Sequence, residues 1–223
     1  MSAATPLLKD AKAVLFDHDG TLVDSEEIHF TLWCEILKEH GVTLSRHFYS
    51  EVMAGIPLVK NAYDAVDAFS LRVDAKVLIK KKQQRLKDFL SNNAFPLMPD
   101  ARMAVERCLQ RGQQLAIVTG GSRIATDKTL SEYGWQRAFS VTVTVEDVKE
   151  SKPAPDCYKK ALSLLGVTAN EAVAVEDTEH GMQSALDANL RCIVIPTALS
   201  SKQNFSKASA QYNSLATCLK NEY

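Results

Sequence analysis

The chain has 223 residues, of which 46% are hydrophobic and 24% are charged, and its formal net charge is -1 at pH 7. A chain of this length can bury a large core in one or two domains. Because its charge is nearly balanced, it has no long-range attraction for nucleic acid or for an anionic membrane surface, and we expect neither as a partner.

The cysteines and the N-terminal segment predict a cellular location. The five cysteines are widely spaced and contain no Cys-x-x-Cys pair, which argues against a disulfide framework or a zinc site. The N-terminal segment lacks a basic region followed by an apolar one, and no stretch approaches the ~20 apolar residues of a membrane span. We therefore expect a cytoplasmic, monomeric protein whose cysteines are small buried hydrophobic residues.

The first informative segment is Ala13–Phe16, an apolar run with the length of a buried strand, after which Gly20 provides a turn. Asp17 and Asp19 therefore lie at the carboxyl end of a predicted strand. Ligands bind at this edge of an open parallel sheet, and two crowded carboxylates repel each other unless a cation or a shared proton relieves them. Mg2+ is the simplest such cation. The plainer alternative is a turn rich in Asp and Gly at the end of a strand.

His18 lies between the two aspartates in the sequence. Successive side chains of an extended backbone point to opposite sides, so this pattern predicts that His18 points away from both carboxylates. We therefore expect the imidazole to pack or to support the site indirectly, and we do not expect it to act as a catalytic base.

Residues 26–95 carry helical signals and no strand signal of comparable quality. An apolar stripe at helical spacing ends at Gly41, and further helices are expected around residues 59–69 and 75–90. The last of these contains the basic run Lys80–Lys82 among apolar residues. We expect this run to be a solvated helix face and not a binding site.

From residue 113 onward, strand and helix patterns alternate. The expected strands are 114–118, 139–145, 172–175 and 191–195, and the expected helices are 123–133, 156–165 and 180–188. Such alternation indicates a parallel sheet that is covered on both faces. With the strand at 13–16, it predicts a doubly wound α/β domain. The polar, Ser-rich residues 197–223 are expected to add one or two helices.

Three further polar clusters follow an apolar run or open a predicted helix. They are Thr119–Gly120–Gly121–Ser122, Lys152–Pro153–Ala154–Pro155–Asp156 and Glu176–Asp177. Together with Asp17–Thr21, this ordered set resembles the haloacid dehalogenase superfamily of aspartyl-phosphate hydrolases. That superfamily has an Asp-x-Asp-Gly-Thr loop, a strand-end Thr or Ser, a Lys and an acidic pair. The resemblance extends from residue 13 to about residue 196.

The resemblance also implies a domain organisation. The α/β catalytic core, a Rossmann-like doubly wound sheet, would comprise residues 1–23 and 97–223. The all-helical cap of the superfamily's first subclass would comprise residues 24–96, inserted after the first strand. The resemblance also places His29 near the cap hinge, as a candidate for a hydrogen bond to the active-site loop.

The acidic residues and the lysine of these motifs have expected catalytic and metal-binding roles. An ionised aspartate can attack phosphorus when a cation screens both charges, and we assign this role to Asp17. The resemblance implies that Asp19 protonates the leaving alcohol and later activates water, while Lys152 supplies a fixed positive charge. Asp17, the backbone carbonyl of Asp19 and Asp177 would hold Mg2+. Glu176 would be a direct or an indirect metal ligand.

Other residues are expected to bind the substrate. Thr119 offers a hydroxyl, and the backbone N–H groups of Gly120 and Gly121 lie where a helix begins, which is a favourable place for a phosphoryl group. Family members often have an Asn or another small polar residue after the Thr or Ser, and Gly120 departs from that pattern. Gly55 belongs to the cap segment that we expect to contact the rest of the substrate.

The sequence thus predicts a Mg2+-dependent phosphatase that hydrolyses a small phosphomonoester, such as a sugar or polyol phosphate, through an aspartyl phosphate. One alternative is a phosphosugar mutase similar to β-phosphoglucomutase. Those relatives carry Val and Arg where this chain has Thr21 and the Gly55–Leu58 segment, and leucine cannot grip a second phosphate. The other alternative is a non-catalytic phosphometabolite-binding or receiver-like module. The complete set of nucleophile, acid, lysine and metal ligands favours the enzyme.

Overall fold

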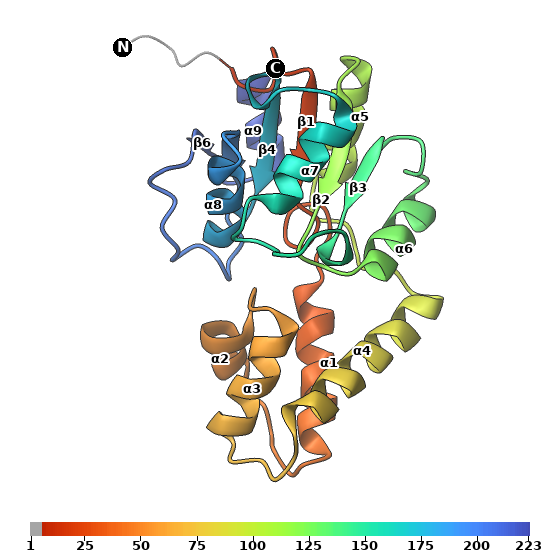
Figure 1. Cartoon of the computed structure of the whole chain (residues 1–223), viewed down its shortest axis with the longest axis vertical. Coiled ribbons are helices and arrows are strands. Elements are labelled where there is room, and N and C mark those ends of the chain that lie inside the picture. The colour runs from red at the N-terminus through yellow and green to blue at the C-terminus, as the bar shows by residue number, and fades with distance from the viewer. Residues whose placement is uncertain (1–5) are drawn as a thin grey trace. The chain divides into compact units, whose positions relative to one another are not determined.

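The computed structural model describes residues 6–223 and divides into two compact units. One unit, which we call the core unit, comprises the segment up to Asp24 together with Pro96–Tyr223, and the other, the cap unit, comprises Ser25–Phe95 (Figure 1). That these units act as catalytic core and cap stays a prediction.

The core unit contains a parallel sheet of six strands in the order β3-β2-β1-β4-β5-β6. The strands are β1 Ala13–Phe16, β2 Gln114–Val118, β3 Val141–Val143, β4 Ala172–Glu176, β5 Arg191–Val194 and β6 Ala210–Gln211. The predicted doubly wound α/β class is confirmed. The sixth strand was not predicted, because two residues in a polar segment are too short to show a strand pattern.

The register of the sheet aligns the ends of its central strands. Phe16, the last residue of β1, lies opposite Ile117 of β2 and Val175 of β4. The chain builds β2 and β3 on one side of β1 and then β4, β5 and β6 on the other, so the order of strands reverses between β1 and β4. Ligands bind at such a switch point in open α/β sheets.

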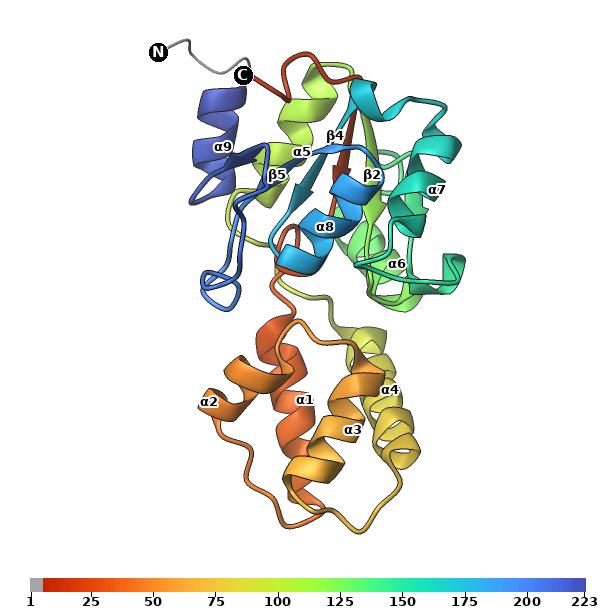
Figure 2. The ribbon, with the colours of Figure 1, turned by 60° about the vertical axis from the view of Figure 1, so that its left-hand side comes forward.

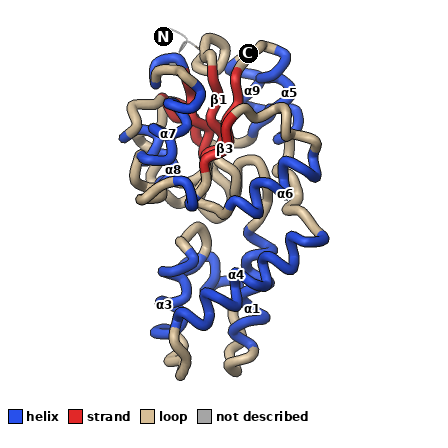
Figure 3. The backbone as a smooth tube through the Cα atoms, turned by 45° about the vertical axis from the view of Figure 1, so that its right-hand side comes forward, coloured by secondary structure: helices blue, strands red, loops and turns tan. Residues whose placement is uncertain are grey.

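Helices cover both faces of this sheet. They are α5 Ala101–Gln110, α6 Arg123–Tyr133, α7 Asp156–Leu165, α8 Glu179–Asp187 and α9 Leu215–Glu222, with short 3-10 turns at Val145–Asp147 and Ala169–Glu171. Figures 2 and 3 show α7 and α8 together on one face of the sheet and α5 and α9 on the other. The predicted glycine stops of α6 and α7 are Gly134 and Gly166, which adopt positive φ angles of 71° and 68°.

The cap unit is helical throughout. Its elements are α1 Glu26–Lys38, α2 Arg46–Phe48, a π-helix at Tyr49–Met53, α3 Leu58–Ala68 and α4 Ala75–Asn92. Its own hydrophobic core is built from α1, α3, α4 and the π-helix, with Trp33, Ile36 and Leu78 among the buried side chains. The helical pattern of the sequence located α1, α3 and α4 but gave no signal for α2 or for the π-helix.

The expectation that Lys80–Lys82 form a solvated face is wrong for Lys82. Its relative exposure is only 4%, because it lies one helical turn after the buried Leu78 on the same face of α4. Its Nζ is 2.9 Å from Nδ1 of His29 and 5.9 Å from the ring centroid of Trp33. The predicted hydrogen bond from His29 to the active-site loop stays a prediction.

The expectation that the cysteines are buried holds for four of the five. All five are free; Cys108, Cys157, Cys192 and Cys218 are buried, and Cys34 is half-buried. None of the helices in residues 6–223 is both long enough and apolar enough to cross a membrane.

Candidate active site

Three carboxylates meet where β1 and β4 end. Asp17 follows β1 directly, and its backbone N–H donates to the carbonyl of Val175 at 2.9 Å. Glu176 is the last residue of β4, and Asp177 is the next residue along the chain. One oxygen atom from each of Asp17, Glu176 and Asp177 lies within 4.8 Å of the others, and all three residues are buried. The predicted acidic residues on either side of the switch point are therefore adjacent in space.

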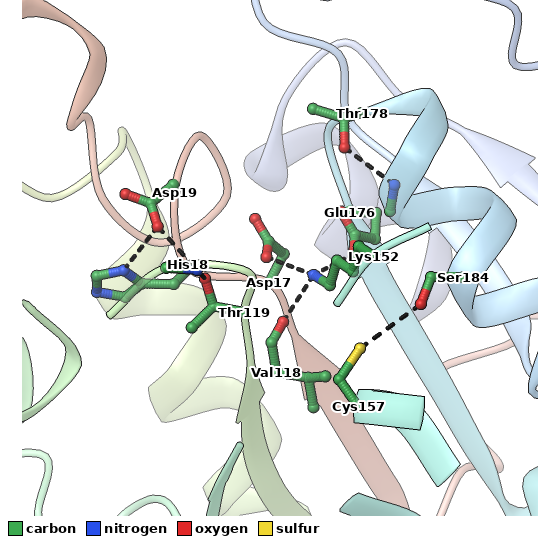
Figure 4. A network of polar contacts seen from close by, with 12 residues as sticks. Asp17, His18, Asp19, Val118, Thr119, Lys152, Cys157, Glu176, Thr178 and Ser184 are labelled. Atoms are coloured by element: carbon green, nitrogen blue, oxygen red, sulfur yellow. Dashed lines mark hydrogen bonds and ion pairs between the residues drawn. The ribbon is translucent and has the colours of Figure 1, made fainter. Parts of the chain in front are cut away.

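Lys152 connects this group to the neighbouring strand. Its Nζ is 2.5 Å from Oδ1 of Asp17, 2.6 Å from Oε1 of Glu176 and 2.7 Å from the carbonyl oxygen of Val118 (Figure 4). These three contacts match the three donors of an ammonium group. The side chain of Lys152 is only 9% exposed. The ammonium is thus held rigidly between two of the carboxylates.

Tyr158 is a member of this group that the sequence analysis did not identify. It lies on the inward face of α7, is completely buried, and donates from its hydroxyl to Oε1 of Glu176 at 2.6 Å. The centroid of its ring is 5.2 Å from Nζ of Lys152, within the range of a cation–π interaction. A buried tyrosine needs a hydrogen-bond partner, so its position on the apolar face of a predicted helix was the signal that could have pointed to a buried polar partner.

The electrostatics of the three carboxylates are dominated by burial. Burial raises the pKa of Asp17 even though Lys152 lowers it, and it raises the pKa of Glu176 to about 7 against the same opposing charge. Burial, followed by repulsion from Asp17 and Glu176, raises the pKa of Asp177 well above its usual value. Burial alone would lower the pKa of Lys152, but Asp17 and Glu176 raise it, so the amine stays charged. With all three carboxylates ionised and Lys152 protonated, the group would carry a net charge of -2.

The same carboxylates have the properties of a metal site. Oδ1 of Asp177 and Oε2 of Glu176 are buried and have no hydrogen-bond partner among residues 6–223. A Cβ at Gly20 would lie 2.3 Å from Oδ2 of Asp177, so a larger residue there would push into this carboxylate. Buried, unpaired carboxylate oxygens are the ligands that Mg2+ prefers, and one divalent cation would supply the missing charge. The residues therefore fit the predicted metal. The contribution of the Asp19 carbonyl stays a prediction.

Asp19 has a different environment. Its side chain is 28% exposed, and its Oδ2 lies 3.2 Å from Nδ1 of His18 and 3.4 Å from Oγ1 of Thr119. His18 is completely buried, and its Nε2 lies 2.9 Å from Oγ1 of Thr129 in α6. The prediction that His18 points away from both aspartates is thus wrong for Asp19.

The reason is that β1 ends at Phe16, before the alternation of side chains could reach His18. The loop instead turns back on itself, with the N–H groups of Leu22 and Val23 both donating to the carbonyl of His18 at 2.9 Å. In such a turn, neighbouring side chains can lie on the same side. We refer to Asp17, Lys152, Glu176 and Asp177 as the carboxylate–lysine cluster, and to His18, Asp19, Thr119 and Thr129 as the histidine–hydroxyl cluster.

Of the predicted phosphate-binding residues, Thr119 belongs to the histidine–hydroxyl cluster and Gly121 adjoins it. Thr119 follows β2, and its Oγ1 accepts a hydrogen bond from the N–H of Gly121 at 2.8 Å. A Cβ at Gly121 would lie 2.8 Å from Oδ2 of Asp19, so a larger residue there would force this carboxylate to shift. Contacts of Thr119, Gly120 and Gly121 with a phosphoryl group stay predictions. Gly55 lies in the cap unit, exposed, with a φ of 70°, and its substrate contact also stays a prediction.

Comparisons with known proteins agree with this arrangement. Residues 14–195 match the family model described as haloacid dehalogenase-like hydrolase. The protein CbbY of Rhodobacter capsulatus is 30% identical over 207 residues, which cover 89% of this chain and 91% of the relative. The fructose-1-phosphate phosphatase YqaB of Escherichia coli is 25% identical over 180 residues, covering 81% of this chain and 94% of the relative.

A solved structure extends the comparison to the whole fold. CbbY of Rhodobacter sphaeroides, crystallised in complex with xylulose-(1,5)bisphosphate, superposes with a TM-score of 0.80 at 26% identity. The match covers 92% of this chain and 94% of that one.

Proposed function

Because the chain belongs to the haloacid dehalogenase-like hydrolase family, we propose that it is a Mg2+-dependent phosphatase that hydrolyses a small phosphorylated carbohydrate through an aspartyl phosphate. The observation that carries the proposal is the carboxylate–lysine cluster, in which a buried ammonium fixes Asp17 beside two further acidic residues. The substrate class is supported by the relatives, one of which is named for a sugar phosphate and another of which was crystallised with a sugar bisphosphate.

In the first half of the proposed reaction, a carboxylate oxygen of Asp17 attacks the phosphorus atom. The bond between phosphorus and the ester oxygen breaks, and Asp19 donates a proton to the departing alcohol. Lys152 favours the ionised form of Asp17 and holds the carboxylate in place, because it donates to Oδ1 at 2.5 Å. The products are the free alcohol and an acyl phosphate on Asp17.

In the second half, water attacks the phosphorus of the acyl phosphate. Asp19, now ionised, takes a proton from this water, and the bond between phosphorus and the Asp17 oxygen breaks. Inorganic phosphate leaves, and both aspartates return to their starting states. When bound by Asp17, Asp177 and Glu176, Mg2+ would offset the negative charge of the carboxylates and of the phosphoryl group.

A phosphate-release screen over sugar and polyol phosphates, with Mg2+ or with EDTA, tests this proposal. We expect Mg2+-dependent release of inorganic phosphate from at least one sugar phosphate and none from the Asp17→Asn variant. Binding of these compounds without any turnover would instead support the non-catalytic module.

The same assay includes an arm for the mutase. With β-glucose 1-phosphate and a trace of glucose bisphosphate, the proposal expects inorganic phosphate or no product. Accumulation of glucose 6-phosphate without phosphate release would overturn it.

The proposal also places the protein in the cytoplasm, since its odd number of widely spaced cysteines suits a reducing compartment.

A further inference from the structure

Of the two aspartates in the loop after β1, Asp19 has the more exposed side chain, at 28% against 9% for Asp17. A carboxylate with two rotatable bonds and partial exposure can adopt several rotamers. A group that must reach both a leaving oxygen and an attacking water needs one defined position, because an error of about 1 Å can cost about 10²-fold in rate. The position of Asp19 therefore needs a structural cause.

That cause is found at its Oδ2 atom. Nδ1 of His18 lies 3.2 Å from this oxygen and the hydroxyl of Thr119 lies 3.4 Å from it, and Gly121 leaves room for it by having no Cβ. Of these contacts, the one from His18 is the shorter, and it comes from a ring that is itself completely buried.

The ring of His18 is fixed at its far end as well. Nε2 lies 2.9 Å from Oγ1 of Thr129, which is completely buried in α6. A neutral imidazole with its proton on Nδ1 satisfies both partners, since it donates to the Asp19 carboxylate and accepts from the Thr129 hydroxyl. An apolar residue at position 18 would remove both contacts and would leave the Thr129 hydroxyl buried without this partner.

We propose that His18 is a positioning residue, which transmits the fixed position of α6, through Thr129, to the carboxylate of Asp19. This inference rests on the proposed function, in which Asp19 donates the proton to the leaving alcohol. It adds two residues, His18 and Thr129, that act on the reaction through Asp19.

The test uses two substrates that differ in their need for a general acid. An alkyl ester, such as the best sugar phosphate of the screen, needs a proton on its leaving oxygen, whereas p-nitrophenyl phosphate releases an acidic phenol that needs little help. We expect His18→Leu to lower kcat/KM by about 30-fold or more for the sugar phosphate but by less than about threefold for p-nitrophenyl phosphate. A purely structural role would lower both values by the same factor, and that result would overturn the inference.

Two further variants keep the test valid if the leucine variant folds poorly. Thr129→Val preserves shape and removes only the hydroxyl, and we expect a loss of about three- to tenfold confined to the sugar phosphate. His18→Asn retains an amide donor near the position of Nδ1 and should recover most of the activity that His18→Leu loses. Equal effects of Thr129→Val on both substrates, or no recovery by asparagine, would contradict the inference.

A matched control lies one turn earlier on the same helix. Thr126 is as completely buried as Thr129, but its hydroxyl donates to the carbonyl of Ser122 at 3.2 Å. Thr126→Val should leave the ratio of the two kcat/KM values at the wild-type value. A change in this ratio as large as that of Thr129→Val would show that any lost hydroxyl in α6 has the same effect, and it would overturn the inference.

A double-mutant cycle separates this inference from the proposed function. In an Asp19→Asn background, His18→Leu should cause no further loss of kcat/KM for the sugar phosphate, because the residue through which it acts is already gone. Additive losses would show that His18 acts independently of Asp19. Failure of the wild type to hydrolyse either ester would instead refute the proposed function and, with it, the role of His18.

Discussion

Two polar clusters lie on opposite sides of the end of β1, and they give two nearly adjacent aspartates different burial and different partners. On the β4 side, the carboxylate–lysine cluster buries Asp17 among charged groups, with Lys152 at 2.5 Å. On the β2 side, the histidine–hydroxyl cluster leaves Asp19 28% exposed and gives it an imidazole and a hydroxyl as partners. Only His18 separates the two aspartates in the sequence.

The comparison teaches that two side chains of the same type can suit different catalytic roles when their surroundings differ. In the proposed mechanism the nucleophile must be ionised and fixed, and the buried ammonium of Lys152 favours the ionised form of Asp17 and holds it in place. The proposed acid–base residue must exchange protons with the substrate and with water, which suits a partly exposed carboxylate whose partners are an imidazole and a hydroxyl.

The largest effect is expected for Asp17→Asn. An amide is a poor nucleophile and cannot form the acyl phosphate, so kcat should fall by more than about 10⁴-fold. Phosphate release by the purified variant measures this loss, and circular dichroism checks that the fold survives. Substantial residual turnover would remove Asp17 from its role.

A smaller and qualitatively different loss is expected for Asp19→Asn. This change removes the proton donor and the base that activates water, so steady-state kcat should fall by about 10² to 10³-fold. With p-nitrophenyl phosphate the variant should still release one equivalent of nitrophenol in a burst, because Asp17 remains able to attack. A loss without a burst would mean that the two aspartates do not differ in the way proposed.

The next effect concerns metal affinity. Asp177→Ala removes one oxygen ligand but leaves Asp17 and Glu176, so about 10 to 100 times more Mg2+ should be needed for half-maximal activity. Excess Mg2+ should restore part of the rate, which a titration of initial velocity against Mg2+ measures. Asp156→Ala, a change at the exposed first residue of α7, is the matched control and should leave the titration unchanged.

The smallest effect is a pH dependence of stability. Burial raises the pKa of Glu176 to about 7 from an ordinary 4.5, so between these values the folded metal-free protein binds more protons than the unfolded chain. Its stability should therefore fall as the pH rises through this window.

Mg2+ competes with these protons, so its effect on stability should depend on pH in the opposite sense. We expect Mg2+ to raise Tm by a few degrees more at about pH 8 than at about pH 5.5. Thermal unfolding with Mg2+ and with EDTA measures both effects. A Mg2+ shift that is the same at both pH values would argue against binding by the buried carboxylates.

The sequence predicted those parts of the molecule that depend on short-range pattern. Apolar runs located β1, β2 and β4, and the rule that ligands bind at the carboxyl ends of parallel strands placed Asp17 and Glu176 at the same edge of the sheet. These predictions need only the local chain and the topology of a parallel sheet. The prediction that Lys152 joins the two carboxylates came instead from the resemblance to the family.

The remaining features depend on partners that the local pattern does not contain. Tyr158 and Lys82 lie on buried helix faces. Tyr158 contacts Glu176 and Lys82 contacts His29, and neither partner is near it in the sequence. His18 departs from the predicted direction because it lies in a turn after β1, where the alternation of side chains in a strand no longer holds.

The central claim is that Asp17, and not Asp19, carries the phosphoryl group during turnover. Borohydride reduces an aspartyl phosphate to homoserine, so quenching the enzyme during turnover and sequencing the peptide of residues 13–38 by mass spectrometry locates the intermediate. The account predicts homoserine at position 17 only when both Mg2+ and a hydrolysable phosphate ester are present. Homoserine at position 19, or phosphate release with no trapped aspartate in either wild type or Asp19→Asn, would contradict it.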